Sequence, residues 1–335
     1  MISAKTAASW LGGAALACAA SGALAQDELK PRKIGVFVIT LQSESLTRWS
    51  SQIKAAAEKL HWDVIVKDGQ NNPTVVAAAL PELLNEGVDA VITMALDAPL
   101  MTEGLKLAKS KGIPVIATAV DVNPAGKELF TATYAPAAYD MGVATVDYLL
   151  KKYPHVKAIG QDISIVFTAD QLIVGAKDAL AKGGGTMQAV ADVDITNLVN
   201  SFTQTATDLA LGHPDAQVLI TCCDFSPLID LPALKAANRP DLLMTSRYDN
   251  DSSLQAIRSG APLVIATDHS AINNFEALDA LAAYFANKAP IPATLKTPSE
   301  IRVIDKDNVP KEGSVWPFDA DLANYAARWS KAYRF

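Results

Sequence analysis

The sequence predicts an α/β protein built from two doubly wound parallel-sheet lobes. Short apolar runs, typical of strands that are covered on both faces, alternate with segments whose apolar residues recur at helical spacing. This alternation runs through the chain in two successive series, and such an order of elements predicts a parallel sheet in each of them. At 335 residues the chain is also long for a single hydrophobic core.

The opening unit of the first series lies between residues 33 and 73. Ile34–Thr40 is a continuous apolar run and predicts a buried strand. The helix that follows ends near residue 60 and carries one apolar stripe, formed by Trp49, Ile53, Ala56, Ala57 and Leu60. A second strand over 64–67 ends in the turn-forming sequence DGQNNP. Such a unit places its loops at the carboxyl edge of the sheet, where ligands bind in open α/β folds.

The remaining elements follow in order from the same two patterns. In the first series we expect helices over 74–86 and 100–111, and strands over 89–94, 113–117 and 126–133. In the second series we expect helices over 137–152, 171–182, 198–211, 228–237, 252–259 and 271–287. The strands of the second series are expected over 164–168, 187–193, 218–222, 242–246, 263–267 and 300–304.

The C-terminal tail predicts one more helix, which begins at Asp319. Its apolar residues recur at helical spacing, as Leu322, Tyr325, Ala326 and Trp329. We expect this helix to pack on the second lobe. A role as a lid or a partner surface is the alternative.

The first 25 residues have the pattern of a secretory signal peptide. Lys5 supplies a positive charge, residues 7–20 form an apolar core, and Ala23-Leu24-Ala25 fits the A-x-A cleavage pattern. We therefore expect cleavage after Ala25 and export of the mature chain. A lipoprotein signal that uses Cys18 is the alternative, which Ala15 disfavours because Leu is usual at that place. No other apolar run reaches the ~20 residues that a membrane span needs.

Composition and motif spacing argue against several classes of function. The net charge is −7 and no basic run is present, which argues against nucleic-acid binding. The four histidines lie far apart, and residues 249–253 begin like a calcium loop but lack its later Gly and Glu, so no metal site is expected. Residues 182–186 carry Lys before the glycines, which indicates a helix C-cap turn instead of a phosphate loop. No nucleophile with an attendant base is visible, so we expect no catalytic residues and no cofactor.

Two cysteines remain after the predicted cleavage, Cys222 and Cys223. Adjacent cysteines can close only a strained ring, so the sequence contains no disulfide framework. We expect both to be small, semi-buried side chains at the end of a strand.

Acidic residues recur just past the ends of predicted strands. Asp97, Asp224, Asp249 and Asp268 all lie at such positions. In two lobes that face each other, these carboxyl edges would line one cleft, and a carboxylate accepts hydrogen bonds from hydroxyl or ammonium groups. The alternative for each residue is an ordinary role in a turn or a helix N-cap.

The opening strand with its DGQNNP loop, together with Ile113-Pro114-Val115-Ile116, resembles the periplasmic sugar-binding proteins of ABC transporters, ribose-binding type. The resemblance covers roughly residues 33–305. It implies a periplasmic binding protein type 1 fold, in which a multi-strand hinge joins the lobes around a ligand cleft. The hinge crossings would lie near residues 133–137, 266–268 and 297–302. The lobes would then be 33–134 with 268–297, and 135–267 with 298–335.

The resemblance also implies a set of ligand-binding positions. Two arginines of the ribose binders are absent, for which Arg48 or Arg247 is a candidate replacement. Aromatic candidates for stacking on a sugar are Trp49, Tyr134, Phe225, Tyr248 and Trp316. The positions that match or neighbour the family's ligand contacts, combined with the strand-end acids, are Ser43, Ser45, Asp97, Asp121, Asp224, Tyr248, Asp249 and Asp268.

These features together predict a periplasmic, non-enzymatic solute-binding protein of an ABC importer. We expect it to bind a sugar or polyol as a monomer and to deliver it to a membrane permease. A cationic or amine-bearing solute is the alternative ligand, since the carboxylates would suit it. Presentation of the ligand to a chemoreceptor or sensor kinase is a second alternative, and an enzyme on the same scaffold is a third.

Overall fold

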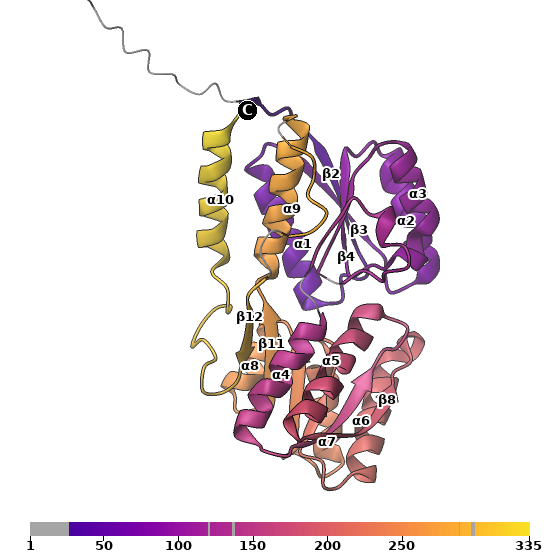
Figure 1. The fold of residues 1–335 in the computed structure, drawn as a ribbon, viewed down its shortest axis with the longest axis vertical. Helices are drawn as coiled ribbons and strands as arrows, with labels where there is room; N and C mark the ends of the chain where they lie inside the picture. The colour runs from indigo at the N-terminus through magenta and orange to yellow at the C-terminus, as the bar shows by residue number, and fades with distance from the viewer. Residues whose placement is uncertain (1–26, 120, 136–137, 288, 296–298) are drawn as a thin grey trace, which may run out of the picture.

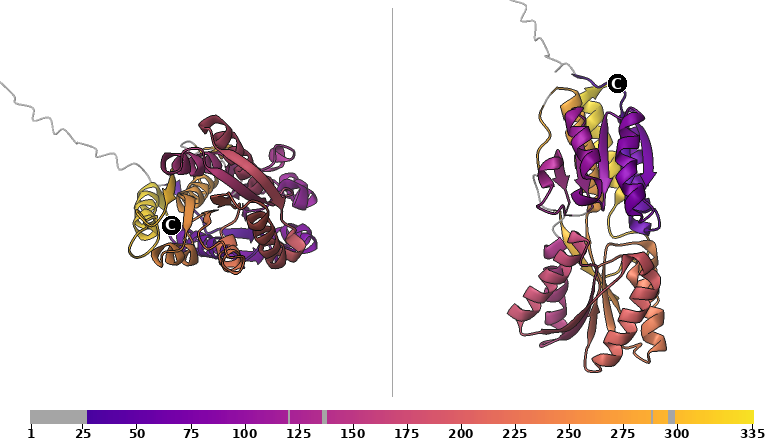
Figure 2. Two further views of the ribbon diagram at one scale, coloured as in Figure 1. Left: turned by 90° about the horizontal axis from the view of Figure 1, so that it is seen from below. Right: turned by 90° about the vertical axis from the view of Figure 1, so that its right-hand side faces the viewer.

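The computed structural model describes residues 27–335 except 120, 136–137, 288 and 296–298. These residues form two α/β lobes, which the right-hand view of Figure 2 shows one above the other. The first 25 residues, with the predicted cleavage site and Cys18, lie outside the described residues. The predicted fold class is confirmed.

The first lobe contains a five-stranded parallel sheet in the order β3-β2-β4-β5-β6. Its strands are β2 (Lys33–Val38), β3 (Asp63–Asp68), β4 (Ala90–Met94), β5 (Val115–Thr118) and β6 (Ala132–Tyr134). Its helices are α1 (Glu44–Glu58), α2 (Pro73–Asn85), α3 (Ala98–Ser110), the short 3₁₀ turn η1 (Lys127–Leu129) and the late helix α9 (Ser270–Phe285). Helix α9 lies beside α1 although more than 200 residues separate them (Figure 1).

The second lobe contains a six-stranded sheet in the order β12-β11-β10-β9-β7-β8. All neighbours are parallel except β11 and β12. The strands are β7 (Lys157–Asp162), β8 (Thr186–Asp192), β9 (Val218–Ile220), β10 (Leu243–Arg247), β11 (Leu263–Asp268) and β12 (Ile301–Ile304). The helices are α4 (Ala138–Lys152), α5 (Phe167–Gly183), α6 (Leu198–Gly212), α7 (Ser226–Ala236), α8 (Asp251–Arg258) and the 3₁₀ turn η2 (Ile195–Asn197).

Local sequence explains why α1 begins and packs where it does. The Ser43 side chain accepts a hydrogen bond from the backbone N–H of Leu46, as a helix N-cap does. All members of the predicted stripe, from Trp49 to Leu60, are buried. The stripe therefore fixes α1 on the sheet beside α9, and the N-terminus of α1 points at the second lobe.

One predicted strand is wrong. Residues 164–168 form a turn and the start of α5, and the strand of this region is β7, seven residues earlier. The apolar residues Ile163, Ile165 and Val166 have the sequence pattern of a strand. In contrast, β7 ends in the buried polar residues Gln161 and Asp162 and has little apolar pattern. The strand expected over 126–133 is likewise shorter, because η1 occupies its first half.

The chain changes lobes between β6 and α4, between β11 and α9, and between α9 and β12. Parts of the first and third crossings lie outside the described residues. Because β11 and β12 pair in antiparallel fashion at the edge of the second sheet, the last two crossings run side by side. The lobes are therefore joined by several segments, as a hinge requires.

The tail differs from the expectation, because α10 (Phe318–Ala332) packs on the first lobe instead of the second. Trp329 is fully buried and donates from Nε1 to Asp279 Oδ1 in α9 at 2.8 Å. The Tyr325 ring lies 5.0 Å from that of Phe275, and its hydroxyl donates to Glu276. The final residues, β13 (Tyr333–Arg334), pair with β1 (Asp27–Glu28). The tail thus makes a fourth crossing, because the apolar stripe of α10 fits the apolar and acidic face of α9.

Candidate functional site: a cavity between the lobes

A cavity lies between the two lobes, at the carboxyl edges of both sheets. It encloses about 890 Å³, including its opening to solvent. The first lobe contributes the loops after β2, β3, β4 and β5 and the start of α1. The second lobe contributes the loops after β7, β9 and β10 and the segment from η2 into α6. This position is the usual place of small-molecule sites in open α/β folds.

Six of the eight predicted ligand-binding residues line this cavity. From the first lobe they are Ser43, Ser45, Asp97 and Asp121, and from the second lobe Asp224 and Tyr248. The structure thus brings together residues that are up to 205 positions apart in the chain. Their contact with a solute stays a prediction.

Asp224 connects the two lobes at the cavity wall. Its Oδ2 accepts a hydrogen bond from Ser43 Oγ at 2.9 Å and from the Ser45 N–H at 3.4 Å. Its backbone carbonyl accepts from Asn250 Nδ2 at 2.9 Å, which fixes the turn. A carboxylate has about four acceptor sites, so Asp224 retains acceptor capacity for the hydroxyl groups of a solute.

Arg247 supplies a cationic donor to the same wall. Its side chain is 7% exposed, and within the described part of the chain its Nε and Nη1 have no hydrogen-bond partner. The guanidinium lies over the Tyr248 ring, 4.9 Å from its centroid. Buried N–H groups without a hydrogen-bond partner are unfavourable, so an oxygen atom bound in the cavity would stabilise them. Sequence analysis named Arg247 only as a replacement donor. The other candidate, Arg48, lies outside this cavity.

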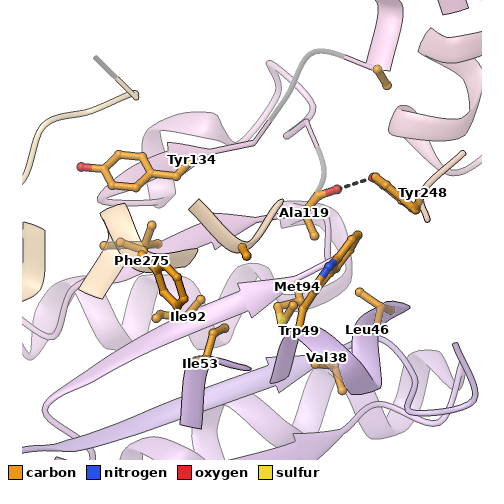
Figure 3. Packing of buried hydrophobic residues seen from close by; sticks show 14 of the residues in the cluster. Val38, Leu46, Trp49, Ile53, Ile92, Met94, Ala119, Tyr134, Tyr248 and Phe275 are labelled. Atoms are coloured by element: carbon orange, nitrogen blue, oxygen red, sulfur yellow. Dashed lines mark hydrogen bonds between the residues drawn. The ribbon is translucent and has the colours of Figure 1, made fainter. Parts of the chain in front are cut away.

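Tyr248 and Trp49 form an aromatic contact across the lobes. Their ring centroids are 4.8 Å apart at an interplanar angle of 86°. The Tyr248 hydroxyl donates to the backbone carbonyl of Ala119 at 2.6 Å, as Figure 3 shows. Burial raises the pKa of this phenol well above its usual range, so it is a neutral donor at physiological pH. Both rings line the cavity, where they can pack on an apolar ligand face.

Asp97 organises a loop of the first lobe, whereas Asp121 connects the first lobe to the start of α4 in the second lobe. Asp97 Oδ1 accepts from the Asn123 N–H at 2.9 Å, and Asp121 Oδ2 accepts from the Ala138 N–H at 2.6 Å. Burial raises the pKa of both carboxyl groups. Thr168 in the second lobe donates from Oγ1 to the Asp121 carbonyl at 3.0 Å. Both residues therefore have, in part, the ordinary structural role in a turn or helix cap that was the alternative to ligand binding.

Asp249 and Asp268 do not line the cavity. Asp249 pairs with Arg48 and also accepts from Thr267 Oγ1 and the Val315 N–H, at 3.0 and 3.1 Å. Asp268 accepts from Ser270 and Asn273 at 2.7 and 2.9 Å, and burial raises its pKa to about 6. Both border a separate small cavity that Ser314, Trp316 and Phe318 of the tail help to enclose. The tail, which was expected to pack on the second lobe, separates them from the main cavity.

Of the aromatic residues proposed to stack on a sugar, some line the main cavity and others lie outside it. Trp49, Phe225 and Tyr248 line the cavity. The Tyr134 hydroxyl instead donates to the Pro292 carbonyl, and Trp316 stacks on His269 with 4.3 Å between ring centroids.

Several lining residues were not predicted from sequence. Asn71 belongs to the DGQNNP loop, and that loop's place at the carboxyl edge of β3 was the signal for it. Ile163 and Val166 were missed because a strand was wrongly predicted over residues 164–168. Ile195 and Leu198 carry no pattern that distinguishes them from ordinary core residues.

The described residues were also compared with the requirements of a metal site, a disulfide and a membrane-spanning helix. Over 27–335, with its gaps, no three His, Cys, Asp or Glu side chains gather as a metal site would require. Cys222 and Cys223 are buried free thiols at the end of β9, as expected, with their sulfur atoms 2.9 Å apart. In the same part of the chain, no helix combines the length and apolar character of a membrane span.

Comparisons with known proteins agree with this architecture. Residues 34–289 match the family model described as periplasmic binding protein domain. The ribose import binding protein of Salmonella typhimurium is 25% identical over 256 residues, which cover 73% of this chain and 81% of that protein. The Caulobacter myo-inositol binding protein bound to myo-inositol has a TM-score of 0.73 at 17% identity, over 83% of this chain and 94% of that chain. An ABC transporter solute-binding protein from Agrobacterium vitis, bound with α-D-tagatopyranose, has a TM-score of 0.74 at 18% identity, over 88% and 98% of the two chains.

Proposed function

The chain belongs to the periplasmic binding protein family of sugar and polyol ABC transporters, and we propose that it binds such a solute between its lobes and delivers it to a membrane permease. Ribose, myo-inositol and tagatose, the solutes named for its relatives, are all polyhydroxylated. Their hydroxyl groups both donate and accept hydrogen bonds, so they need carboxylate acceptors and cationic donors together.

One observation carries the proposal: Arg247 and the carboxylates Asp121 and Asp224 line the same cavity. The carboxylates are acceptors, and Arg247 is a buried donor with unpartnered N–H groups. Paired hydroxyls of a sugar satisfy both kinds of group. A cationic solute would pair with the lining carboxylates Asp97, Asp121 and Asp224, but it would leave the N–H groups of Arg247 without an acceptor.

In this mechanism the solute biases the lobes toward the closed arrangement. A ligand shifts such an equilibrium only by its differential contacts with the two states. Ser45 and Asp121 contribute from one lobe, and Asp224 and Arg247 from the other, so a solute that bridges these groups makes its full set of contacts only when the lobes are closed. The closed form would then be the one that docks on the permease.

The proposal also includes export of the chain and its oligomeric state. The signal-peptide pattern of residues 1–25 and the periplasmic relatives support secretion into the periplasm, with the mature chain beginning at Gln26. We propose that this mature chain works as a monomer, without a cofactor and without catalysis.

A thermal-shift screen of the chain from Gln26 onward tests the proposal. Sugars, polyols, sugar acids and amines are compared, each with the wild type and with Arg247→Met. A solute at 100 times its Kd adds roughly 2.7 kcal/mol of stability. A shift with a sugar or polyol that Arg247→Met loses supports the proposal. A shift with amines alone, or with no compound of the panel, contradicts it.

A further inference from the structure

The second-lobe wall of the cavity is the open side of a small hydrophobic cluster. The buried members of this cluster include Ile163, which also lines the cavity, and Phe202 and Cys222. Its partly buried members include Val166, Ile195, Leu198 and Phe225, and all four line the cavity. The cluster therefore completes its packing only where something fills the cavity.

In the two segments that carry Ile163, Val166, Ile195 and Leu198, several hydrogen-bonding groups are already engaged. The Ser164 N–H donates to Asp192 at 2.8 Å, the Val166 N–H to the Ile163 carbonyl at 2.8 Å, and the Asn197 N–H to the Asp194 carbonyl at 3.2 Å. Thr168, the polar side chain that this stretch does place in the cavity, donates to the backbone of Asp121. A solute hydroxyl directed at this wall would lose its water partners without gaining protein partners, which is unfavourable.

The polar groups lie around the rest of the cavity. Ser45, Asn71 and Asp121 belong to the first lobe, whereas Asp224 follows β9 and Arg247 ends β10 in the second lobe. The cavity thus has one face suited to hydroxyls and another suited to hydrocarbon. A free hexose or a linear polyol carries a hydroxyl on most of its carbon atoms and offers only small C–H surfaces, so it fills the first of these faces better than the second.

We propose that the solute is a sugar or polyol that bears an alkyl or aryl substituent, with the substituent packed against Ile163, Val166, Ile195 and Leu198. This inference rests on the proposed function and narrows its substrate class. Ile165, next to Val166, and Val199, next to Leu198 at the start of α6, are further apolar residues and are 74% and 60% exposed. A substituent larger than a methyl group therefore has apolar surface to follow.

Calorimetry with matched sets of ligands tests the inference. For each of several hexose configurations, the parent sugar, its 6-deoxy form and its phenyl glycoside are titrated into the chain from Gln26 onward. Each buried methylene favours binding about fourfold, so in the configuration that binds, a substituted form should bind at least tenfold more tightly than the parent. Parent sugars that bind equally well or better overturn the inference and leave the proposed function standing. Absence of binding throughout overturns both.

Variants of the apolar wall give a second readout. Val166→Thr keeps the side-chain shape and adds a hydroxyl, so it should reduce the preference for the substituted ligand at least threefold while binding of the parent sugar changes little. Val75→Thr in α2, half-buried and outside the cavity, is the matched control. If Val166→Thr fails to fold, Ile195→Thr replaces it. An unchanged preference in a folded wall variant contradicts the inference.

Discussion

Arg48 of α1 in the first lobe pairs with Asp249, which follows β10 in the second lobe, at 3.0 Å between Nη2 and Oδ1. Asp249 is 2% exposed. One turn earlier in α1, Glu44 accepts hydrogen bonds from the N–H and Oγ of Ser252 at 3.2 and 3.0 Å. These contacts border the cavity without lining it, so the first turns of α1 hold the lobes together independently of the solute.

Arg48→Ala should weaken solute binding although Arg48 does not line the cavity. Loss of the pair with Asp249 removes a contact that favours the closed state, and the affinity should fall about three- to tenfold. Calorimetry measures the affinity, and small-angle scattering should show a larger radius of gyration without ligand. Lys54→Ala, an exposed position of the same helix, is the control. An affinity equal to that of the wild type would show that the pair does not stabilise closure.

Arg247→Met should separate binding from stability. Hydrogen bonds to a charged group contribute roughly 1.5–3 kcal/mol, so affinity should fall about tenfold to more than a hundredfold. Without ligand, the melting temperature should stay constant or rise, since the variant removes a buried cation whose Nε and Nη1 have no partner among the described residues. A thermal-shift series with and without the solute measures both effects. A ligand-induced shift that survives unchanged would remove Arg247 from the site.

Asp230 of α7 should make the protein less stable as the pH rises. Burial raises its pKa to about 8, far above the ordinary range of an aspartate. The folded state therefore retains a proton that the unfolded chain releases. Stability is fully present below the unfolded pKa and is lost as the pH rises toward 8, by at most about 1.4 kcal/mol per pH unit.

Urea unfolding at pH 5, 6, 7 and 8 measures whether the free energy of unfolding falls as the pH rises. Asp230→Asn should flatten the loss of stability across this range, because the amide does not titrate. Asp208→Asn at an exposed position of α6 is the control. A pH dependence identical in wild type and Asp230→Asn would exclude Asp230 as its source.

Trp329 should carry much of the attachment of α10 to the first lobe. Trp329→Ala should lower the free energy of unfolding by about 3–5 kcal/mol, as for other large buried aromatic side chains. Trp329→Phe should lower the free energy of unfolding much less. Loss of the hydrogen bond to Asp279 costs about 1 kcal/mol, and the smaller ring adds a minor packing loss. Chemical denaturation measures both. Similar small losses in the two variants would mean that α10 is weakly attached.

The predictions from sequence succeeded where one local pattern decides the outcome. The stripe from Trp49 to Leu60 is a helix with one buried face, and Ile34–Thr40 contains a buried strand. They failed at β7, where Gln161 and Asp162 are buried by contacts that are distant in sequence. Gln161 Nε2 donates to the Phe202 carbonyl and to Thr205 Oγ1 in α6, a compensation that no local pattern reveals.

The sequence by itself determined that the chain alternates strands and helices in two series, and that carboxylates follow the ends of its strands. Both are properties of short segments, set by side-chain periodicity and turn chemistry. Only the tertiary structure decided which carboxylates share the cavity. Asp121 and Asp224 face it, whereas Asp249 and Asp268 are enclosed by Arg48 and the tail, because α10 returns to pack on α9. The position of that tail depends on the fit between two distant helix faces, which exists only once both lobes have folded.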